Sequence, residues 1–514
     1  MAGSAGTGNH TEQLEVESTF EVEEPWTLPD LARLPGVTAV GTAELDLDAT
    51  YLDTADLHLL RGRATLRRRT GGEDAGWHLK LPAGPDRWGL RRPLGESARA
   101  VPGDLLALTL ARRRGADLVP VVRLATHRSA HRLAGADSRD LVEVAVDDVS
   151  AFLLGADGGS VGVTAWREVE AELVEPGGAG QQLLEDVEEA LLDSGARASR
   201  WRSKLARALD VRLGELTPEP DRLRRRGPAA DVVSAYVAAQ VEQLVAYDAA
   251  VRRDEDDAVH KMRVATRRLR SALATYRPLL DPDRSEPLRD ELAWLAGLLG
   301  VARDAEVLRE RLVSLARAEP PELLLGPVVA RIDSDLGRAY RDGHAAVLEA
   351  LDEPRYLRLL SDLDRLVADR PASDRGRQPA REELPRMVAR DWRRLRRRVR
   401  SAGSGDGRFA LHDARKAAKR SRYAAEAAST VLGARASRFA AAMAQVQETL
   451  GEHQDALAAQ DTLRRIGVQA HLDGENGFSF GRLHALEQRR AARAADAFGA
   501  VWAQSSRKKL RGWL

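Results

Sequence analysis

A basic segment with helical spacing occurs twice in this chain and constrains the fold more than any other feature. VHKMRVATRRLR at 259–270 returns as LHDARKAAKRSR at 411–422. Residues three and four positions apart share one face of a helix, so each copy presents a stripe of one histidine and several cations. The stripes consist of His260, Arg263 and Arg267 in the first copy, and of His412, Arg415, Lys416 and Lys419 in the second.

Each copy is followed at nearly the same distance by one of a second pair of related segments, LLGVARDA and TLGEHQDA. A single basic stripe is also typical of a solvated helix face. Two stripes, each with its own histidine, instead predict a helical bundle with an internal pseudo-two-fold repeat. We expect the two halves to close around one polyanion.

Length and composition limit the remaining possibilities. The 514 residues are enough for two or three domains, and 79 Lys and Arg against 78 Asp and Glu leave a net charge of +1, which favours no partner. The absence of cysteine excludes disulfides and thiolate chemistry and fits a reducing compartment. The N-terminus lacks the pattern of a secretory signal, and no segment reaches the ~18 apolar residues of a spanning helix. We therefore expect a cytoplasmic protein without a membrane segment.

Residues 1–212 have the two-residue alternation of strands. Strands are expected at 14–22, 49–53, 64–70, 76–81, 119–129, 141–149 and 164–174, with helices near 101–114, 178–194 and 199–209. Turns rich in Gly, Asp and Pro separate the strands and suit hairpins. We therefore expect an α+β protein of two domains, whose N-terminal domain is a closed antiparallel β-barrel with flanking helices.

The polar faces of these strands carry acidic and basic residues in separate rows. The acidic rows are Glu15 with Glu17, Glu143 with Asp147, and Glu168 with Glu170 and Glu172; the basic row is Arg67 with Arg69, followed by Lys80. On any one strand, such residues are also typical of a solvated sheet face. Inside a barrel, however, buried charges would need partners. Carboxylates bind Mg²⁺ or Mn²⁺ and guanidinium groups bind phosphate oxygens, which is the combination that phosphoanhydride chemistry needs.

An ordered set of motifs runs through this first domain. It consists of EVEST at 15–19, YLDTADLHLLRGRATLRRR at 51–69, WHLKLP at 77–82, VEVAVDD at 142–148, REVEAEL at 167–173 and SKLARAL at 203–209. Together these motifs resemble the CYTH family of triphosphate-tunnel metalloenzymes, which have a closed barrel and act on tripolyphosphate, nucleoside triphosphates or thiamine triphosphate. The resemblance implies catalytic roles for Glu15, Glu17, Glu168, Glu170 and Lys80. It implies metal ligation by Glu15, Glu17, Asp147, Glu170 and Glu172, and phosphate binding by Arg67, Arg69, Lys80, Arg87, Arg123 and Lys204.

Thr19 is the main departure from the family pattern, E-x-E-x-K, because it stands where that pattern has lysine. A hydroxyl donates a hydrogen bond but brings no charge, so the orientation of the substrate or the stabilisation of the leaving group could be weaker. The register of Arg87 and Arg123 is also open, and Arg91 or Arg128 could serve in their place.

Residues 213–228 combine Pro, charge and a break in composition, and are expected to be a linker. From 229 to 514 the aliphatic spacing predicts an all-α domain, with helices at 286–318, 321–351, 354–369, 380–400, 409–433, 436–464 and 482–505. VHKMRVATRRLR, LAGLLGVARDAEVL, HDARKAAKRSRYAAE and LGEHQDA occur in the order of the CHAD family, an all-helical domain known for its histidines and for binding inorganic polyphosphate. The resemblance implies polyphosphate binding by His260, Arg263, Arg267, Arg270, His412, Arg415, Lys416 and Lys419.

Other ligands fit these basic helices less well. Neither motif has a second His or Cys at metal spacing, which counts against zinc. Aromatic residues make up only 4% of the chain, so the stacking groups that single-stranded nucleic acid needs are scarce, and no nucleic acid is expected. The leading hypothesis is Mg²⁺- or Mn²⁺-dependent hydrolysis of inorganic triphosphate, coupled to polyphosphate binding. The alternatives are a catalytically impaired protein of polyphosphate granules and, less well supported, a cyclase-like activity; the oligomeric state stays open.

Overall fold

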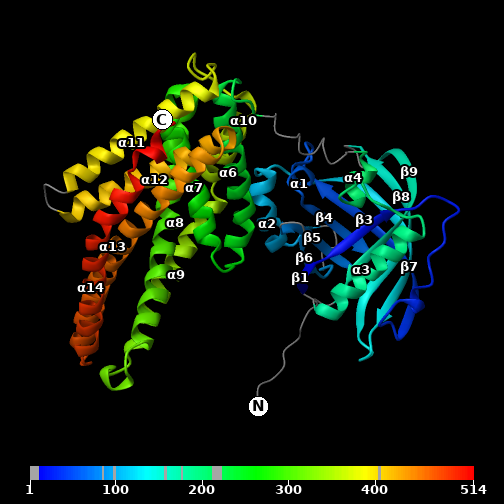
Figure 1. Ribbon diagram of the computed structural model, residues 1–514. Coiled ribbons are helices and arrows are strands. Elements are labelled where there is room, and N and C mark those ends of the chain that lie inside the picture. The colour runs from blue at the N-terminus through cyan, green and yellow to red at the C-terminus, as the bar shows by residue number, and fades with distance from the viewer. Residues whose placement is uncertain are drawn as a thin grey trace. The chain divides into compact units, whose positions relative to one another are not determined.

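The computed structural model describes residues 11–83, 86–95, 100–155, 159–174, 177–210, 223–402 and 407–514. Its contacts divide the chain into two units, Met1–Glu219 and Pro220–Leu514. The first contains an antiparallel sheet with helices and the second is helical, as the residue patterns predict (Figure 1). The expected linker, 213–228, falls largely outside the described residues. Among the described helices, none is both long and apolar enough to cross a membrane.

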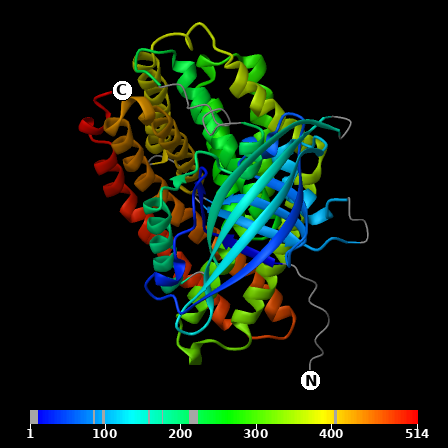
Figure 2. The ribbon, with the colours of Figure 1, turned by 90° about the vertical axis from the view of Figure 1, so that its right-hand side faces the viewer.

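One ten-stranded antiparallel sheet organises the first unit, in the order β1-β6-β5-β4-β3-β7-β8-β9-β2-β10. Figure 2 shows its long strands side by side and strongly twisted. The strands are β1 (Thr11–Glu15), β2 (Glu17–Glu21), β3 (Ala39–Asp53), β4 (Thr65–Thr70), β5 (Gly76–Ala83), β6 (Asp86–Arg92), β7 (Val119–Ala134), β8 (Asp140–Leu154), β9 (Ser160–Leu173) and β10 (Arg197–Ala198).

The sheet is not closed into a barrel, so the prediction of a closed barrel is wrong in this respect. β1 pairs with β6 at one end of the strand order, whereas β2 pairs with β9 and β10 at the other. Val16 separates β1 from β2, and the N-terminal segment changes partner at this residue instead of continuing as one strand. The two ends of the sheet are therefore joined by the chain itself, and side chains from both ends can meet on one concave side.

The apolar residues of this unit form two clusters. Phe20, Val144, Val146 and Val169 lie on the side of the sheet that α3 (Gly178–Asp193) covers, where they pack against residues such as Leu183 and Val187. The second cluster joins β3, β7 and β8 to α1 (His58–Arg61) and α4 (Lys204–Ala208), and includes Tyr51, Leu60, Leu124 and Leu205. α2 (Gly103–Arg113) packs against α1. One apolar cluster thus lies on the side of the sheet opposite the charged concave side, and the other lies at one end of the sheet.

Two strands differ from the sequence prediction. Alternation predicts only 49–53, but β3 begins at Ala39, and its first half is mostly exposed and built largely of small residues without apolar–polar alternation. β6, Asp86–Arg92, is not predicted at all, because Trp88 and Leu90 are its only large apolar residues. The predicted helix at 199–209 is shorter, since α4 begins at Lys204 after the N-cap Ser203.

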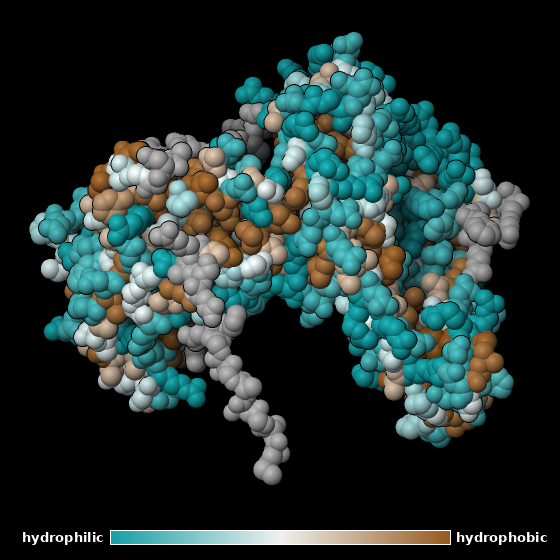
Figure 3. All heavy atoms as spheres, turned by 180° about the vertical axis from the view of Figure 1, so that it is seen from behind, coloured by the Kyte–Doolittle hydropathy of each residue, from teal (hydrophilic) through white to brown (hydrophobic). Residues whose placement is uncertain are grey.

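The second unit consists mainly of long helices, most of which pack against the next helix in sequence (Figure 1). They are α6 (Ala229–Arg252), α7 (Ala258–Thr275), α8 (Pro282–Arg317), α9 (Val328–Asp352), α10 (Pro354–Asp369), α11 (Ala380–Ala402), α12 (Gly407–Leu432), α13 (Ala434–Leu472), α14 (Phe478–Ser505) and α15 (Lys508–Arg511). The two basic motifs lie on α7 and α12, which contact each other. Figure 3 shows a largely hydrophilic surface on this unit.

Candidate functional site

The strand register places the predicted acidic rows on one face of the sheet. Glu17 lies opposite Glu172 and Thr19 lies opposite Glu170 on the neighbouring strand. Asp147 of β8 lies opposite Glu168 of β9. Because alternate residues of a strand point to the same side, carboxylates from β1, β2, β8 and β9 face the concave side together.

The predicted cations face the same side from the other half of the sheet. Arg67 of β4 lies opposite His78 of β5, and Lys80 lies opposite Thr65. Lys80 joins the two halves, because its Nζ lies 2.7 Å from Glu15 Oε2 and 2.9 Å from Glu17 Oε2. Arg87 Nη1 lies 3.3 Å from Glu17 Oε1. The carboxylates from one half of the sheet and the cations from the other half therefore lie next to each other at Lys80.

The carboxylates near Lys80 outnumber the cations they contact. Burial favours the neutral form of Lys80, but Glu17 and Glu15 outweigh it and raise the pKa of the ammonium. Burial works against ionisation of Glu17 too, yet Lys80 lowers the pKa of that carboxyl. Burial and the charges of Glu15, Glu17 and Glu170 raise the pKa of Glu172 to about 7, despite Lys80. Glu172 therefore lacks enough neighbouring positive charge to be fully ionised at neutral pH.

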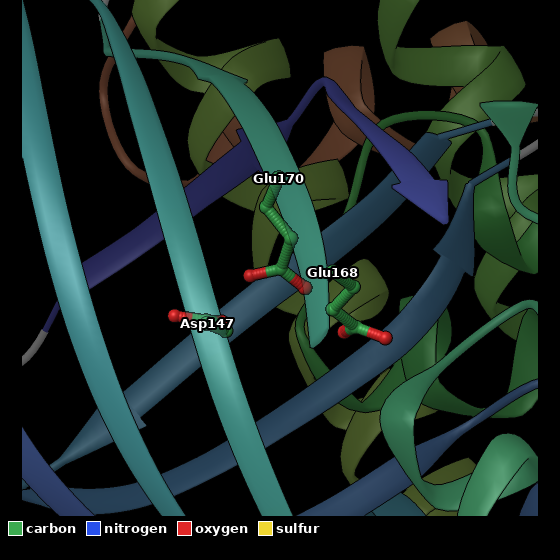
Figure 4. Close-up of side chains that lie close together, drawn as sticks. All are labelled: Asp147, Glu168 and Glu170. Carbon is green, nitrogen blue, oxygen red and sulfur yellow. The ribbon is translucent and has the colours of Figure 1, made fainter. Parts of the chain in front are cut away.

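A second acidic group lies beside the first and is compensated by the chain itself. Oxygens of Asp147, Glu168 and Glu170 lie within 4.8 Å of one another and could hold a metal ion. Figure 4 shows these side chains on β8 and β9, with Glu170 reaching towards Asp147. Lys204 Nζ lies 3.0 Å from Asp147 Oδ2 and 2.8 Å from Glu168 Oε1, and it also contacts Glu170. Arg128 donates from Nε and Nη2 to the two oxygens of Asp147, both at 2.7 Å, and also to Glu170.

Helix α4 is held so that Lys204 points into this group. Glu168 Oε2 accepts hydrogen bonds from Trp166 Nε1 at 2.6 Å and from Arg207 Nη1 at 3.2 Å. The Arg207 guanidinium also lies 4.9 Å from the centre of the Trp166 ring, a cation–π contact. Glu168 thus contacts Lys204 and Arg207, which are both on α4, and positions the helix.

Arg123 lies on the opposite face from the other predicted phosphate ligands, so the structure does not bring it together with them. It is exposed and pairs with Asp48, with Nη2 and Oδ2 2.5 Å apart. Arg128 lies an odd number of residues further along β7 and so points to the concave side, where Arg91 also lies, opposite His78. Strand 119–129 has no sequence signal for the correct parity, because apolar residues occur on both of its faces.

The remaining predicted cations lie on the concave side but differ in their surroundings. Arg67 donates to Tyr51 Oη at 3.1 Å. Arg69 pairs with Asp74 at the end of the row, and burial together with Arg67 and Arg128 lowers its pKa well below the usual value. His78, which sequence reasoning missed, donates from Nε2 to the backbone carbonyl oxygen of Asp74 at 2.9 Å, and burial followed by the charge of Arg67 strongly lowers the pKa of its imidazole.

In the helical unit the two motif copies make the same contacts. Arg263 Nη1 lies 2.9 Å from Asp304 Oδ1, and Arg415 Nη2 lies 3.5 Å from Asp455 Oδ1. Glycines on the facing helices leave room for both guanidinium groups. A Cβ on Gly300 would lie 3.5 Å from Arg263 Nη2, and one on Gly451 would lie 3.3 Å from Arg415 Nη2.

Cations from both copies gather where α7 contacts α12. Burial and the charges of Arg267, Arg415 and Arg263 lower the pKa of Lys419 to about 7. Burial likewise lowers the pKa of Arg267, although its Nη2 lies 3.4 Å from Tyr423 Oη. These four residues, the cation cluster, therefore repel one another, since Asp304 and Asp455 are too few to balance them.

Two of the other four predicted ligands of this unit, His260 and His412, lie near arginines of the cation cluster. Burial followed by Arg303 lowers the pKa of His260, and burial followed by Lys416 lowers that of His412, so both imidazoles are neutral at pH 7. Lys416 and Arg270 are exposed on α12 and α7.

Comparisons with known proteins agree with this division of the chain. The family model for the CYTH domain matches residues 13–203, and that for the CHAD domain matches residues 235–464. The chain belongs to the proteins that join a CYTH domain to a CHAD domain. It is 40% identical over 501 residues to the uncharacterized protein MT2285 of Mycobacterium tuberculosis strain CDC 1551, with 94% of each chain covered.

Two solved structures are similar to one part of the chain. PptA from Streptomyces chartreusis matches 54% of this chain and 99% of its own, with 22% identity and a TM-score of 0.46. The CHAD domain from the plant Ricinus communis matches 55% of this chain and 93% of its own, with 25% identity and a TM-score of 0.45.

Proposed function

We propose that the CYTH domain hydrolyses inorganic triphosphate with the help of Mg²⁺ or Mn²⁺. The observation that carries this proposal is the facing arrangement of carboxylates and cations on the concave side, with Lys80 between them. A structural role would be better served by equal numbers of paired charges, because uncompensated buried charge is destabilising. Burial, together with the charges of Glu15, Glu17 and Glu170, raises the pKa of Glu172 despite Lys80, and a bound cation would favour its ionised form.

The residues present fit a divalent cation. Carboxylate oxygens are the usual ligands of Mg²⁺ and Mn²⁺. We assign the ion to Glu15, Glu17, Glu170 and Glu172. Arg128 and Lys204 contact both Asp147 and Glu170, but Asp147 is fully buried whereas Glu170 is partly exposed. When bound, such an ion would offset phosphate charge and orient a water molecule for attack.

The cations of this face would bind the phosphate chain. Arg67 and Arg69 offer guanidinium forks to the phosphate oxygens, and Lys80 and Lys204 offer point charges. Binding of the chain would draw Lys204 from the carboxylates towards the phosphates, which frees part of Glu170 for the ion. Thr19, opposite Glu170, contributes only a hydroxyl at the position of the family lysine. We therefore expect a working enzyme with a low rate.

Phosphate release from tripolyphosphate tests the proposal directly. We expect release that needs Mg²⁺ or Mn²⁺, stops with EDTA and falls at least a hundredfold in Glu170→Ala. ATP, thiamine triphosphate and long-chain polyphosphate form the comparison panel, and cyclic nucleotide production from ATP would indicate a cyclase instead. Release no greater than that of Glu170→Ala with every substrate and metal would leave a binding protein without turnover.

We infer that the CHAD domain binds inorganic polyphosphate through the cation cluster, and that its two halves arose by duplication. The matched contacts Arg263–Asp304 and Arg415–Asp455 support the duplication. A linear polyanion would relieve the repulsion that lowers the pKa of Lys419, and such binding would place the protein at polyphosphate granules. Neutralising Arg263, Arg267 and Lys419 together should abolish binding of polyphosphate, whereas an unchanged affinity would contradict the inference.

A further inference from the structure

One histidine lies among the cations of the concave side. His78 of β5 is paired in register with Arg67 of β4 and with Arg91 of β6, so its side chain points to the same side as theirs. Lys80, two residues further along β5, also points to this side, about 6.8 Å away along the strand. A chain of two or three phosphates that contacts Lys80 therefore reaches His78.

The backbone fixes the orientation of the His78 ring. Its Nε2 donates to the carbonyl oxygen of Asp74 at 2.9 Å, in the turn that joins β4 to β5. In the neutral ring Nδ1 then carries a lone pair and no proton. Within the described residues the structure gives Nδ1 no hydrogen bond. An acceptor cannot bind phosphate oxygens, so this atom meets a phosphate chain favourably only after it has taken up a proton.

The charges around the ring link phosphate binding to that proton. The charged residues near His78 come from three strands and one turn: Arg67 and Arg69 on β4, Lys80 on β5, Arg91 on β6, and Asp74, which pairs with Arg69. Burial and the four cations strongly lower the pKa of the imidazole, so it is neutral in the free protein. A triphosphate bound to these cations places several negative charges beside the ring and reverses the effect. Phosphate binding and protonation of His78 therefore favour each other.

The leaving diphosphate needs a proton or a positive charge, because negative charge builds up on it as the phosphoanhydride bond breaks. Thr19 brings only a hydroxyl to the position of the family lysine. Despite burial, neighbouring carboxylates raise the pKa values of Lys80 and Lys204, so both ammonium groups retain their protons. Arginine does not release a proton in proteins. An imidazolium, in contrast, has the acidity of a general acid near neutral pH.

We propose that His78 is the residue that donates a proton to the leaving diphosphate. The proposal rests on the proposed function and adds a catalytic residue to it. Binding of the triphosphate adds a proton to Nδ1. A water oxygen then bonds to the terminal phosphorus and its proton passes to bulk water, while the bond from this phosphorus to the bridging oxygen breaks and leaves its electron pair on that oxygen. Nδ1 transfers its proton to the leaving diphosphate, and the imidazole becomes neutral again.

Variants of the full-length protein test this role. His78→Gln removes the proton that Nδ1 would carry, and His78→Arg keeps a positive charge that is not released near pH 7. His127→Gln is the matched control, because His127 is an exposed histidine of the same sheet that pairs with Asp46 on the opposite face. The parent protein for all three carries Arg263→Gln/Arg267→Gln/Lys419→Gln, which removes the cation cluster of the CHAD domain.

Kinetics separate proton transfer from charge and from structure. We expect kcat for tripolyphosphate at pH 7 to fall about a hundredfold in both His78 variants, within the range of general acid catalysis, and KM to change by less than about threefold in His78→Arg. In the parent and in His127→Gln, kcat should also fall between about pH 7 and pH 9, and this decrease should be absent from both His78 variants. Recovery of kcat in His78→Arg would show that charge alone is needed. A low kcat that keeps the decrease would show a structural role, and either result overturns the proposal.

Calorimetry separates this role from hydrolysis itself. Tripolyphosphate binding is measured with EDTA, and without divalent metal, in buffers of different ionisation enthalpy. At pH 7 the parent and His127→Gln should take up about one proton more than His78→Gln. Equal uptake in all three proteins overturns the proposal. A parent protein that releases no phosphate with any metal refutes the proposed hydrolysis instead, and the calorimetric difference then still shows whether a bound phosphate chain protonates His78.

Discussion

The depressed pKa of Lys419 predicts that polyphosphate binding depends on pH in a definite direction. The pKa of this ammonium is about 7 in the free protein, because burial and three arginines disfavour its charged form. A polyanion in the cation cluster would stabilise the ammonium and return its pKa towards the ordinary value of about 10.4. Binding above pH 7 must then take up a proton. The affinity should be highest at and below pH 7, and should fall about tenfold for each pH unit above it.

Calorimetry in buffers of different ionisation enthalpy measures this proton uptake together with the affinity. Lys419→Arg is the informative variant, because arginine stays charged at every pH of the experiment and should bind with little dependence on pH between 7 and 9. Any uptake that remains in this variant belongs to His260 and His412, whose pKa values are also lowered in the free protein. Equal affinity of the wild-type protein at pH 7 and pH 9, without proton uptake, would refute the reasoning.

Three further predictions concern stability and rate. Arg311→Ala should destabilise the protein by about 3–5 kcal/mol in urea unfolding, because Arg311 Nη2 lies 2.6 Å from the fully buried Glu487, which would lose a main partner. The control Arg309→Ala breaks the exposed pair with Asp333 and should lower the free energy of unfolding by less than about 1 kcal/mol. Thr19→Lys should raise kcat for tripolyphosphate, and no change would show that the missing lysine does not limit the rate. Trp166→Phe should weaken tripolyphosphate binding several-fold, because Glu168 loses a hydrogen bond and holds Lys204 less firmly, and a change in kcat alone would contradict this positioning role.

The sequence predicted the general plan because each half repeats a simple pattern. Alternation located most strands, and the duplicated histidine motif located α7 and α12. The parity of Arg123 against Arg128 could not be predicted, because it depends on the strand pairing between β7 and β8. The open order of the sheet depends likewise on a single residue, Val16, whose role is visible only in the pairing of its two flanking strands.

Residues that act through others were also beyond sequence reasoning. Arg207 and Trp166 are separated along the chain, and nothing in their local sequence indicates that they meet at Glu168. Motif matching finds side chains that face a ligand directly, whereas side chains that position those residues are found only from the structure.

The two domains show opposite kinds of imbalance, and this contrast argues that both bind something. Burial and then the neighbouring carboxylates raise the pKa of Glu172 despite Lys80, whereas burial and then the neighbouring arginines lower the pKa of Lys419. Elsewhere the same chain balances buried charge, as where Arg311 and Arg490 both contact Glu487. Because the fold pairs its charges where only stability matters, the charge imbalance around Glu172 and Lys419 is better explained by a ligand. A divalent cation would supply positive charge to the carboxylates of the CYTH domain. A chain of phosphates would supply negative charge to the cation cluster of the CHAD domain.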